Sequence, residues 1–594
     1  MPYIKGGEYI VDFLIKEKVP FIFGICGHGN VGLLDALYDR KDEIRLVSPR
    51  HEQAAGHMAD VYYRVTHKSA ATLTSIGPGS ANLPMALANA FMDSSGILVL
   101  TANAPTQQAA RGAFQEMYRH HPADFASMLR PCAKRIYQPQ RVDMLPLMLR
   151  QAYSLSGTGR PGPVVVDIPF NVFQEEAEVS YEAAQTDAIR SRTGASPDDV
   201  SACFDLLQRA RRPLIFAGNG VTLSEAGPEL TALVERLQIP VVNLPNGMGT
   251  LDMRNPLALG FVGRNGAYQA NEAARKCDVL LTLGARFDDR SASSWIPGYS
   301  WNIPPTRLIQ VDIDPSELGR NYSVTLGIAA DVKTFLRQIL DELSRHEAPD
   351  LAASEPWRED IRIWRTEWQA KIASNFDKER SPLQPEQVIR DLRAVLPDDA
   401  IVIPDVGAHH SWFMQFWEAR QPQTLLNAYG FGGMGFSVCG VLGAKLAAPE
   451  RVCVSVCGDG GFMMAPHVLA TAVEYDISAI WVVWNNFGWT AIRDIQTGMF
   501  QGREIGTLFY RDGERWNPDF AAMARSCGVE ALTVEHGRDL KEALEHAILL
   551  NKPMLIDLHV DGDIHLPSTG AWQLPPTPYR DPAFGERYLP SRND

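Results

Sequence analysis

The sequence has no excess of positive charge and no long apolar run. Its 594 residues include 56 Lys and Arg against 70 Asp and Glu, which gives a net charge of −14. Such a chain lacks the basic surface with which proteins bind nucleic acids or anionic lipids. No apolar run approaches the roughly 20 residues of a membrane span, and no basic-then-apolar leader opens the sequence. We therefore expect a cytoplasmic protein with neither a nucleic-acid nor a membrane partner.

Cysteine is also scarce, with eight residues that lie mostly inside apolar stretches. A disulfide scaffold requires a small, cysteine-dense secreted chain, so that class is excluded. Cys453 and Cys457 are four residues apart on a predicted strand, and we expect them to pack in the core rather than bind zinc. Apolar residues make up 45% and charged residues 21% of the chain, which is ordinary for a globular protein and excludes global disorder.

What the sequence does contain is three groups of short apolar runs separated by helical patterns. Runs of this kind predict parallel strands covered by helices on both faces, so the expected fold class is α/β with three doubly wound parallel-sheet domains. Trp357, Ile361, Trp364 and Trp368 recur at helical spacing between the second and third groups, and they predict an amphipathic helix packed on the body. The expected domains are 1–185, 196–345 and 381–562, with a tail or lid at 563–594.

The strongest local pattern follows the apolar run RVCVSV. The sequence GDGG at 458–461 ends that strand, and a second strand ends 27 residues after Asp459, at Asn486. A strand–helix–strand crossover of this length predicts parallel neighbours, so the two side chains should meet at one edge of the sheet. Glycines let the backbone approach a phosphate, and hard oxygen ligands beside a diphosphate favour Mg²⁺. For a lone GDG, a plain turn is the alternative.

A second pattern is RHEQ at 50–53, between a short apolar run and a helix of small residues. By position alone, Glu52 is typical of an ordinary first-turn helix charge. The His-Glu pair is not a zinc-protease motif, because position 55 is Ala where HExxH needs His.

These two patterns, in this order, resemble the thiamine-diphosphate (ThDP) enzymes, most closely the acetolactate (acetohydroxyacid) synthase branch. The matching segments span nearly the whole chain and are RHEQAAGHMADVYYRVT, SIGPGSANL, AFQEM, GRPGPVVVDIP, GARFDDR, VDIDP, FGGMGF and GDGGFMM with NN. The resemblance implies a pyrimidine-binding, a central nucleotide-binding-like and a diphosphate-binding domain. It also implies a homodimer or homotetramer with active sites at the subunit interface.

The resemblance assigns the cofactor residues one at a time. Glu52 matches the glutamate that hydrogen-bonds the aminopyrimidine ring of ThDP. Gln115, in the segment 114–116, matches the segment that reaches the cofactor of the partner subunit. The matched Mg²⁺ ligands are Asp459, Asn486 and the backbone carbonyl of Gly488. The matched diphosphate binders are Gly407, His409, Gly460 and Gly461. Met434 matches the bulky wedge that bends ThDP, and Gly432 lies beside it as a further cofactor-binding residue.

A second cofactor, FAD, is implied for the central domain. The positions that fall where the synthases bind FAD are Arg160, Gly218, Gly220, Gly263, Gly284, Arg286, Asp288, Asp312 and Asp331. A middle domain whose glycine-rich turns bind ADP, or bind nothing, is the alternative. In this branch the flavin would be structural, because the joining of two carbonyl compounds has no net redox step.

The sequence departs from the synthases where the substrate would bind. The loop that faces the thiazolium ring is GHGN at 27–30, where synthases have Pro-Gly-Gly-Ala. His28 and Asn30 would offer hydrogen bonds and an acid or base near the reactive carbon. A similar loop occurs in ThDP hydrolases of cyclic 1,2-diones, whereas a structural histidine on a turn is the bland alternative for His28.

Four other pocket positions bear on the substrate. Phe170 replaces the family's lysine, Ala408 replaces a glutamine, and Ile495 replaces the tryptophan that selects the larger 2-oxo acid. Arg290, which faces the substrate carboxylate in synthases, is retained. His120, His121 and His410 are further candidates for residues near the pocket.

Together these features predict a ThDP- and Mg²⁺-dependent lyase or carboligase. It would decarboxylate a 2-oxo acid and transfer the remaining acyl group to a second carbonyl, giving a 2-hydroxy ketone. The main alternative is hydrolytic cleavage of a cyclic or polyhydroxylated 1,2-diketone. A third class is an inactive paralogue with a structural or regulatory role, which would lack Glu52, Asp459 or Asn486; all three are present.

Overall fold

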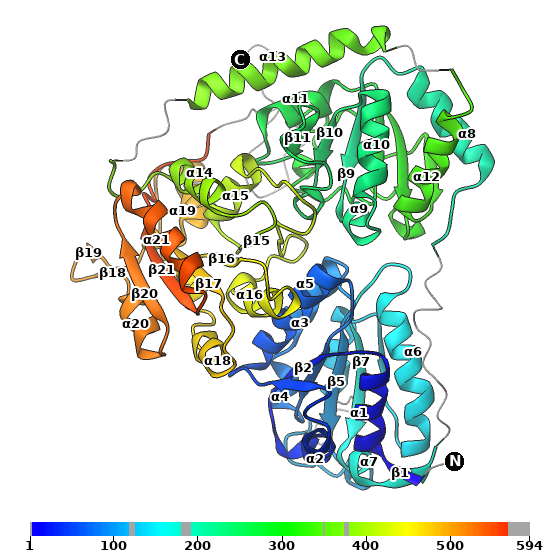
Figure 1. Ribbon diagram of the computed structural model, residues 1–594, viewed down its shortest axis with the longest axis vertical. Coiled ribbons are helices and arrows are strands. Elements are labelled where there is room, and N and C mark those ends of the chain that lie inside the picture. Colours follow the sequence, from blue (N-terminus) through cyan, green and yellow to red (C-terminus); the bar gives the residue numbers. More distant parts are fainter. Residues whose placement is uncertain (1–2, 118–124, 180–191, 348–350, 374–378, 568–594) are drawn as a thin grey trace.

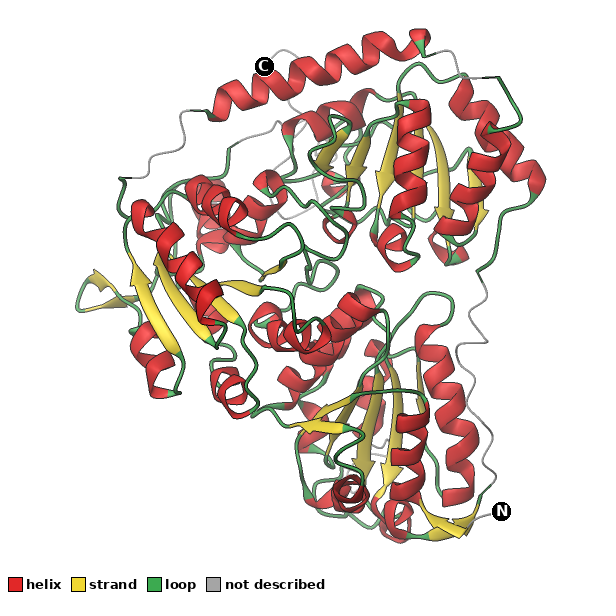
Figure 2. Ribbon diagram, in the orientation of Figure 1, coloured by secondary structure: helices red, strands yellow, loops and turns green. Residues whose placement is uncertain are grey.

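Three parallel sheets follow one another along the chain and form the body of the protein. The computed structural model describes residues 3–117, 125–179, 192–347, 351–373 and 379–567. In Figure 1 the first sheet (blue to cyan) lies at the bottom, the second (green) at the top right and the third (yellow to orange) at the left. Helices flank each sheet (Figure 2), so the predicted α/β class with three doubly wound domains is confirmed.

The first sheet has six parallel strands in the order β3-β2-β4-β5-β7-β6. Its strands are β2 (Phe21–Gly24), β3 (Arg45–Val47), β4 (Ala71–Thr74), β5 (Leu98–Asn103), β6 (Arg135–Tyr137) and β7 (Val164–Pro169). Its helices are α1 (Gly6–Lys16), α2 (Val31–Asp39), α3 (Glu52–Thr66), α4 (Pro78–Ala81), α5 (Pro84–Met92), α6 (Leu145–Gly157) and α7 (Phe170–Gln174). A short antiparallel pair, β1 (Tyr3–Lys5) with β8 (Glu176–Glu178), joins the two ends of this domain.

The central sheet also has six parallel strands, in the order β11-β10-β9-β12-β13-β14. Its strands are β9 (Pro213–Ala217), β10 (Val241–Asn243), β11 (Ala258–Phe261), β12 (Val279–Leu283), β13 (Arg307–Asp312) and β14 (Leu326–Ala329). Its helices are α8 (Pro197–Gln208), α9 (Asn219–Leu223), α10 (Gly227–Leu237), α11 (Tyr268–Lys276) and α12 (Val332–Leu343). The chain leaves β9 to one side and later returns to the other side at β12, so the strand order reverses between these two strands.

The third sheet has five parallel strands in the order β15-β16-β17-β21-β20. Its strands are β15 (Ile401–Pro404), β16 (Cys453–Gly458), β17 (Ile480–Asn485), β20 (Glu530–Val534) and β21 (Met554–His559). Its helices are α14 (Pro385–Val395), α15 (Ala408–Phe416), α16 (Phe436–Ala447), α17 (Asp459–Phe462), α18 (Val468–Glu474), α19 (Thr490–Met499), α20 (Phe520–Ser526) and α21 (Gly537–Leu550). Cys453 and Cys457 are buried in its core, as predicted.

The amphipathic helix predicted from the tryptophan spacing is present as α13 (Glu355–Ile372). Its four predicted apolar residues are buried, and Trp357 Nε1 donates a hydrogen bond to the carbonyl of Pro213 at 3.0 Å. In Figure 1 the helix lies along the outside of the central domain. None of the helices in the described part of the chain is long and apolar enough to cross a membrane.

The first and third domains share one core through helices α3 and α16, which lie side by side in Figure 1. Glycines allow this contact, because a Cβ on Gly443 would overlap the carbonyl oxygen of Met58 and one on Gly440 would meet the side chain of Val61 at 2.5 Å. The two domains are therefore packed backbone to backbone at this point.

Of the predicted tail or lid, residues 568–594 lie outside the described part of the chain.

Candidate functional site

Asp459 lies at the carboxyl end of β16, beside the end of β17. The two strands are parallel neighbours with Gly458 opposite Trp484, as the sequence predicted. The carboxylate of Asp459 accepts hydrogen bonds from the backbone N–H of Gly488 at 3.0 Å and from Asn517 Nδ2 at 2.8 Å. Burial raises its pKa to about 6, and no arginine or lysine among the described residues pairs with it.

The amide of Asn486 lies at the same sheet edge as Asp459. Its Nδ2 donates to Thr490 Oγ1 at 2.8 Å, which leaves the amide oxygen for a ligand. Asn517 donates to Asn485 Oδ1 at 2.7 Å as well as to Asp459, so it ties the ends of both strands together. Sequence reasoning missed Asn517, because it lies 58 residues after Asp459 and no local pattern marks it.

A second group of polar residues follows β15. His409, buried in the first turn of α15, has no hydrogen-bond partner for Nε2, and burial lowers its pKa to about 4. Asp405 is fully buried, and its carboxylate accepts from the backbone N–H of Gly435 at 2.8 Å. A Cβ on Gly461 would lie 2.8 Å from Asp405 Oδ2, which explains a glycine there. Asp405 was not singled out from the sequence, although an acidic residue directly after an apolar strand indicates a candidate site residue, as it did for Asp459.

The loop at 427–435, between α15 and α16, carries Met434, which is half-buried. Gly432 and Gly435 adopt φ angles of +75° and +83°, a backbone conformation that favours glycine. The loop lies against helix α5 of the first domain, because the backbone N–H of Gly433 donates to Asn89 Oδ1 at 3.2 Å. The first domain therefore helps to hold the residue that was predicted to be the wedge.

Glu52 is the first residue of α3, and the side chain of His51 caps that helix by accepting from the N–H of Gln53. Its Oε2 accepts a hydrogen bond from Asn82 Nδ2 at 2.8 Å. A Cβ on Gly79 would lie 3.1 Å from Oε1, so a glycine there gives the carboxylate room. Among the described residues, Glu52 forms no hydrogen bond or ion pair with the groups around Asp459.

The loop at 27–30 forms a short 3-10 helix after β2. The ring of His28 lies 5.8 Å from that of Phe114, which is 76% exposed, and Gln115 follows with a φ of +64°. The prediction for Asn30 needs a correction. Its buried amide accepts from the N–H of Gly27 at 3.0 Å and donates to the carbonyl of Ile25 at 3.0 Å, so it closes the loop instead of facing a substrate.

The glycines predicted for FAD lie at the carboxyl ends of the central strands, where they pack against neighbouring backbone. Gly218, after β9, would place a Cβ 2.4 Å or less from the backbone of the turn after β12, where Gly284 has a φ of +52°. Gly220 donates its backbone N–H to the carbonyl of Gly284 at 2.9 Å. Gly263 donates its N–H to Asn271 Oδ1 at 2.8 Å. A Cβ on Gly220 would lie 2.6 Å from Gly284 Cα and one on Gly263 would lie 2.2 Å from the carbonyl oxygen of Arg290, so these glycines have a packing reason to be glycine.

Asp331 and Asp288 also have structural partners. Asp331 is the N-cap of α12 and accepts from the N–H of Thr334 at 2.9 Å, so the structure gives it a capping role. Asp288 accepts from the backbone N–H of Arg290 at 2.9 Å and from the hydroxyl of Tyr429 at 3.0 Å.

Arg160, Arg286 and Asp312 gather where the first and central domains meet. Arg160 lies 3.8 Å from the carboxylates of both Asp314 and Glu317, and Arg286 donates to the carbonyl of Met92. Burial raises the pKa of Asp312 to about 6.

Arg290 meets two aromatic residues of the third domain, the partly buried Tyr429 and the buried His410. Its guanidinium lies over the ring of Tyr429 at 5.2 Å and 3.5 Å from Nδ1 of His410, whose pKa lies well below its ordinary value because of burial. Phe170 begins α7, Ala408 begins α15 and Ile495 lies within α19, all half-buried. His120 and His121 lie outside the described residues.

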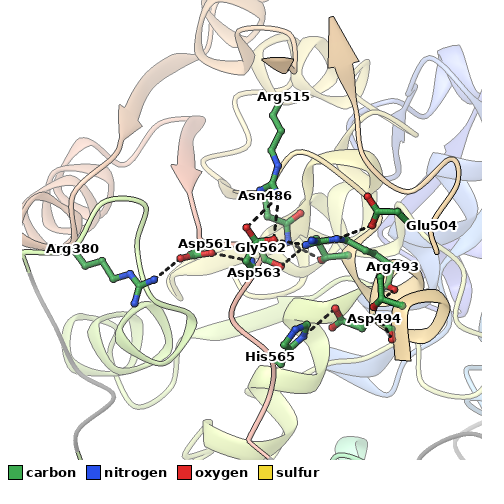
Figure 3. Close-up of polar contacts among 12 residues, drawn as sticks. Arg380, Asn486, Arg493, Asp494, Glu504, Arg515, Asp561, Gly562, Asp563 and His565 are labelled. Atoms are coloured by element: carbon green, nitrogen blue, oxygen red, sulfur yellow. Dashed lines mark hydrogen bonds and ion pairs between the residues drawn. The ribbon is translucent and has the colours of Figure 1, made fainter. Parts of the chain in front are cut away.

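The chain at the start of the predicted tail or lid crosses next to Asn486 (Figure 3). A Cβ on Gly562 would lie 3.1 Å from the backbone oxygen of Asn486. Asp563 pairs with Arg493 of α19 and, at 3.1 Å, with Arg515. These ion pairs hold the chain after β21 across the carboxyl end of β17.

Comparison with known proteins gives matches to three domain families in chain order. "Thiamine pyrophosphate enzyme, N-terminal TPP binding domain" matches residues 4–124, the "central domain" of the same enzymes matches 200–339, and the "C-terminal TPP binding domain" matches 405–558. Each match lies within one of the three domains; the central match spans its whole sheet, whereas the first ends before β6 and the third begins just after β15.

Several acetolactate synthase subunits are similar to nearly the whole of this chain. The chain is 34% identical over 576 residues to a "Probable acetolactate synthase large subunit" of Methanocaldococcus jannaschii, covering 95% of this chain and 93% of that protein. It is 30% identical over 573 residues to the "Acetolactate synthase isozyme 3 large subunit" of Escherichia coli, covering 95% and 96%. To the mitochondrial "Acetolactate synthase catalytic subunit" of Aspergillus candidus it is 31% identical, covering 94% and 80%.

Proposed function

Since this chain belongs to the thiamine pyrophosphate enzymes and, among them, to the family of the acetolactate synthase large subunits, we propose that it decarboxylates a 2-oxo acid and joins the remaining acyl group to a second carbonyl compound. The product would be a 2-hydroxy ketone. The observation that carries the proposal is the pair of polar groups on two different domains: Glu52 with Asn82, and Asp459 with Asn486.

The residues at the end of β16 and β17 fit a magnesium ion. Mg²⁺ would be held by the carboxylate of Asp459, the amide oxygen of Asn486 and the carbonyl of Gly488, a set of hard oxygen ligands. A carboxylate whose pKa is raised to about 6 by burial, and which pairs with no arginine or lysine among the described residues, suits a bound cation.

The polar groups after β15 fit the diphosphate. His409 Nε2 is buried without a partner, and an anion beside it would favour the protonated ring, which would then hold a proton at that nitrogen against the phosphate oxygens. The remaining diphosphate contacts would come from Gly407, Gly460 and Gly461, and Met434, with Gly432 beside it, would set the bend of the cofactor.

Bound ThDP would supply a carbon that adds to a carbonyl and accepts the electron pair released when CO₂ leaves. Glu52 would share a proton with the aminopyrimidine ring, and Asn82 fixes the carboxylate that does so. Arg290 would bind the carboxylate of the 2-oxo acid, helped by the neutral His410 beside it.

We propose that a second copy of the chain completes the site. An exposed apolar surface surrounds the loop of Met434, made of Met85 (40% exposed), Phe431 (52%), Met463 (44%) and Met464 (50%). Contiguous apolar surface of this kind marks a protein–protein contact. The partner's first domain would cover it in a homodimer or homotetramer and would bring its own Glu52 and Gln115 to the cofactor.

For FAD we propose a structural site in the central domain, at the point between β9 and β12 where the strand order reverses. Nucleotides bind at such points in open α/β sheets, and Gly218, Gly220, Gly284 and Arg286 follow these two strands. Arg160, Gly263, Asp288, Asp312 and Asp331 lie at or near the same edge. A flavin absorbance band at about 450 nm in the purified protein would support this proposal, and a colourless protein with no extractable flavin would contradict it.

A cyclic 1,2-diketone hydrolase is the second candidate, favoured by His28. Its imidazole lies beside the exposed Phe114 and offers an acid or base where synthases have an apolar loop. The two functions share every cofactor residue, so substrate trials separate them. CO₂ release from pyruvate or another 2-oxo acid supports the carboligase. Ring opening of 1,2-diketones, without CO₂ release from any 2-oxo acid, would overturn the carboligase and support the hydrolase.

The cofactor assignment is tested with Glu52→Gln. The glutamine keeps a side-chain oxygen for Asn82, so the fold and the binding of ThDP and Mg²⁺ should persist, while turnover should fall by at least about 100-fold because the shared proton is lost. Cofactor binding is measured by calorimetry and turnover by product formation. Activity close to that of the wild type would refute the role of Glu52.

A further inference from the structure

We propose that Asp93, Arg64 and Asn89 of the first domain are positioning residues for the cofactor-bending loop at 427–435 of the third domain. The inference rests on the proposed function, because that function gives Met434 of this loop its task. These three residues belong to none of the matched cofactor positions.

Asp93 holds the loop in its middle. The side chain is 3% exposed, and its Oδ1 accepts a hydrogen bond from the backbone N–H of Gly430 at 2.9 Å. Its Oδ2 accepts from Arg64 Nη2 at 3.2 Å, so the carboxylate is fixed by a second buried residue of the same domain. A carboxylate held in this way sets where Gly430 lies.

Arg64 reaches both ends of the loop. Its guanidinium is bound by the carboxylate of Asp60 at 2.7 and 3.0 Å, and its Nη1 donates to the carbonyl of Asn427 at 2.5 Å. The same guanidinium lies 4.8 Å from the ring centre of Phe436, the first residue of α16 after the loop. Charge-assisted hydrogen bonds in a buried site are among the stronger polar contacts.

Asn89 holds the loop next to Met434 itself. It is fully buried, and its Oδ1 accepts from the N–H of Gly433 at 3.2 Å. The central domain adds a further contact through Asn246, whose amide accepts from the N–H of Asn427 at 3.0 Å and donates to its carbonyl at 3.1 Å. Residues from both other domains thus hold this loop.

The loop needs external acceptors because it has little conformational preference of its own. Four of its residues, at 430, 432, 433 and 435, are glycine, which leaves the backbone many accessible conformations. Within the third domain, the carboxylate of Asp405 accepts a hydrogen bond from the backbone N–H of Gly435, and the carbonyl of Ala428 accepts one from the N–H of Gly432. Two of the four glycine N–H groups, those of Gly430 and Gly433, are held by the first domain. Loss of these contacts should therefore move Met434 while the metal ligands stay in place.

The test compares Asn89→Ala and Asp93→Ala with a matched control, Gln423→Asn. Gln423 also joins the third domain to α3, donating to the carbonyl of Arg64 at 3.0 Å, but it lies outside the loop. Asparagine is a suitable replacement, because it adopts the left-handed backbone conformation of this position, where φ is +59°. Asn89→Ala removes a neutral amide, whose oxygen accepts from Gly433, and so keeps the test informative if Asp93→Ala does not fold.

Three measurements are made on each folded variant: affinity for Mg²⁺ with pyrophosphate, affinity for ThDP with Mg²⁺, and the rate at which the C2 hydrogen of bound ThDP exchanges with deuterium. We expect Asn89→Ala and Asp93→Ala to bind pyrophosphate as the wild type does. ThDP affinity and the exchange rate should each fall about tenfold, as expected when a buried hydrogen bond is lost. Gln423→Asn should match the wild type in all three.

Three results would overturn the positioning role: unchanged ThDP affinity and exchange in Asn89→Ala, an equal fall in pyrophosphate and ThDP affinity, or the same losses in Gln423→Asn. In each case a wild type that binds ThDP and accelerates the exchange leaves the proposed function standing. A wild type that binds no ThDP would overturn both.

Discussion

His57 lies fully buried in the middle of α3, where it contacts both domains that share this core. Its Nε2 is 3.3 Å from Gln53 Nε2, and its ring meets that of Phe436 edge to face at 5.5 Å. Burial lowers its pKa to about 4, from an ordinary value of 6.5. The folded protein therefore keeps this ring neutral in a pH range where the unfolded chain protonates it.

This difference makes stability depend on pH. The unfolded state binds more protons between pH 6.5 and about 4, so the stability that the neutral ring contributes is fully present above pH 6.5 and is lost as the pH falls through that window. In His57→Gln, the free energy of unfolding in urea should rise with pH less steeply there, by up to about 1.4 kcal/mol per pH unit.

The comparison must be made between variant and wild type, because other buried groups act in the opposite sense. Burial raises the pKa of Asp405 and of Asp312 to about 6, so the folded state holds more protons on these carboxyls than the unfolded chain does between pH 3.8 and 6. Because both proteins contain these aspartates, their effect on stability cancels when the pH dependence of the variant is subtracted from that of the wild type. An identical slope in the two proteins would show that His57 is already protonated, or reaches water, in the folded state.

At the scale of elements, the contact between α3 and α16 depends on glycine. A Cβ at position 443 would overlap the backbone carbonyl of Met58, which cannot rotate away as a flexible side chain would. Gly443→Ala should therefore lower the free energy of unfolding by about 1–3 kcal/mol or more, although alanine is the better helix former.

Gly498→Ala is the matched control, because Gly498 also lies in a helix, α19, and nothing stands within 4 Å of its added Cβ. It should raise stability by up to about 1 kcal/mol. Both variants are measured by denaturant unfolding. A Gly443→Ala protein as stable as the control would mean that α3 and α16 separate more easily than their packing indicates.

The elements were largely predictable from the sequence, and the partners of single polar residues were not. The runs RVCVSV and AIWVV become β16 and β17 as adjacent parallel strands, because apolar runs and crossover length are local signals. Asp405 and Asn517 act through contacts with residues 30 and 58 positions away, and no local period records such pairs. Asn30 was predicted to bind the substrate because of its residue type. In the structure, the oxygen and the nitrogen of its amide both bond to the backbone of its own loop.

At the scale of the whole molecule, helix α3 contributes residues to both the first and the third domain's part of the proposed site. It begins at Glu52 and, three turns later, Arg64 holds the loop that carries Met434. Glu52 nevertheless forms no hydrogen bond or ion pair with the Asp459 group among the described residues of its own chain. In the proposed assembly, each site would take Glu52 from one copy and Asp459 from the other.

Subunit complementation tests that arrangement directly. Glu52→Gln and Asp459→Asn should each be inactive as pure proteins, since each lacks one half of every site. In a mixed dimer, one site combines both altered residues, and the other combines an intact Glu52 from one copy with an intact Asp459 from the other. Equal mixing after reversible dissociation should thus restore about a quarter of the wild-type activity, as random pairing makes half the dimers mixed and half of their sites intact. Sites built within a single chain would restore none, because every chain in the mixture carries one of the two changes. Mixing each variant with itself is the control, and activity that appears only in the heterologous mixture would assign the two halves of the site to different copies.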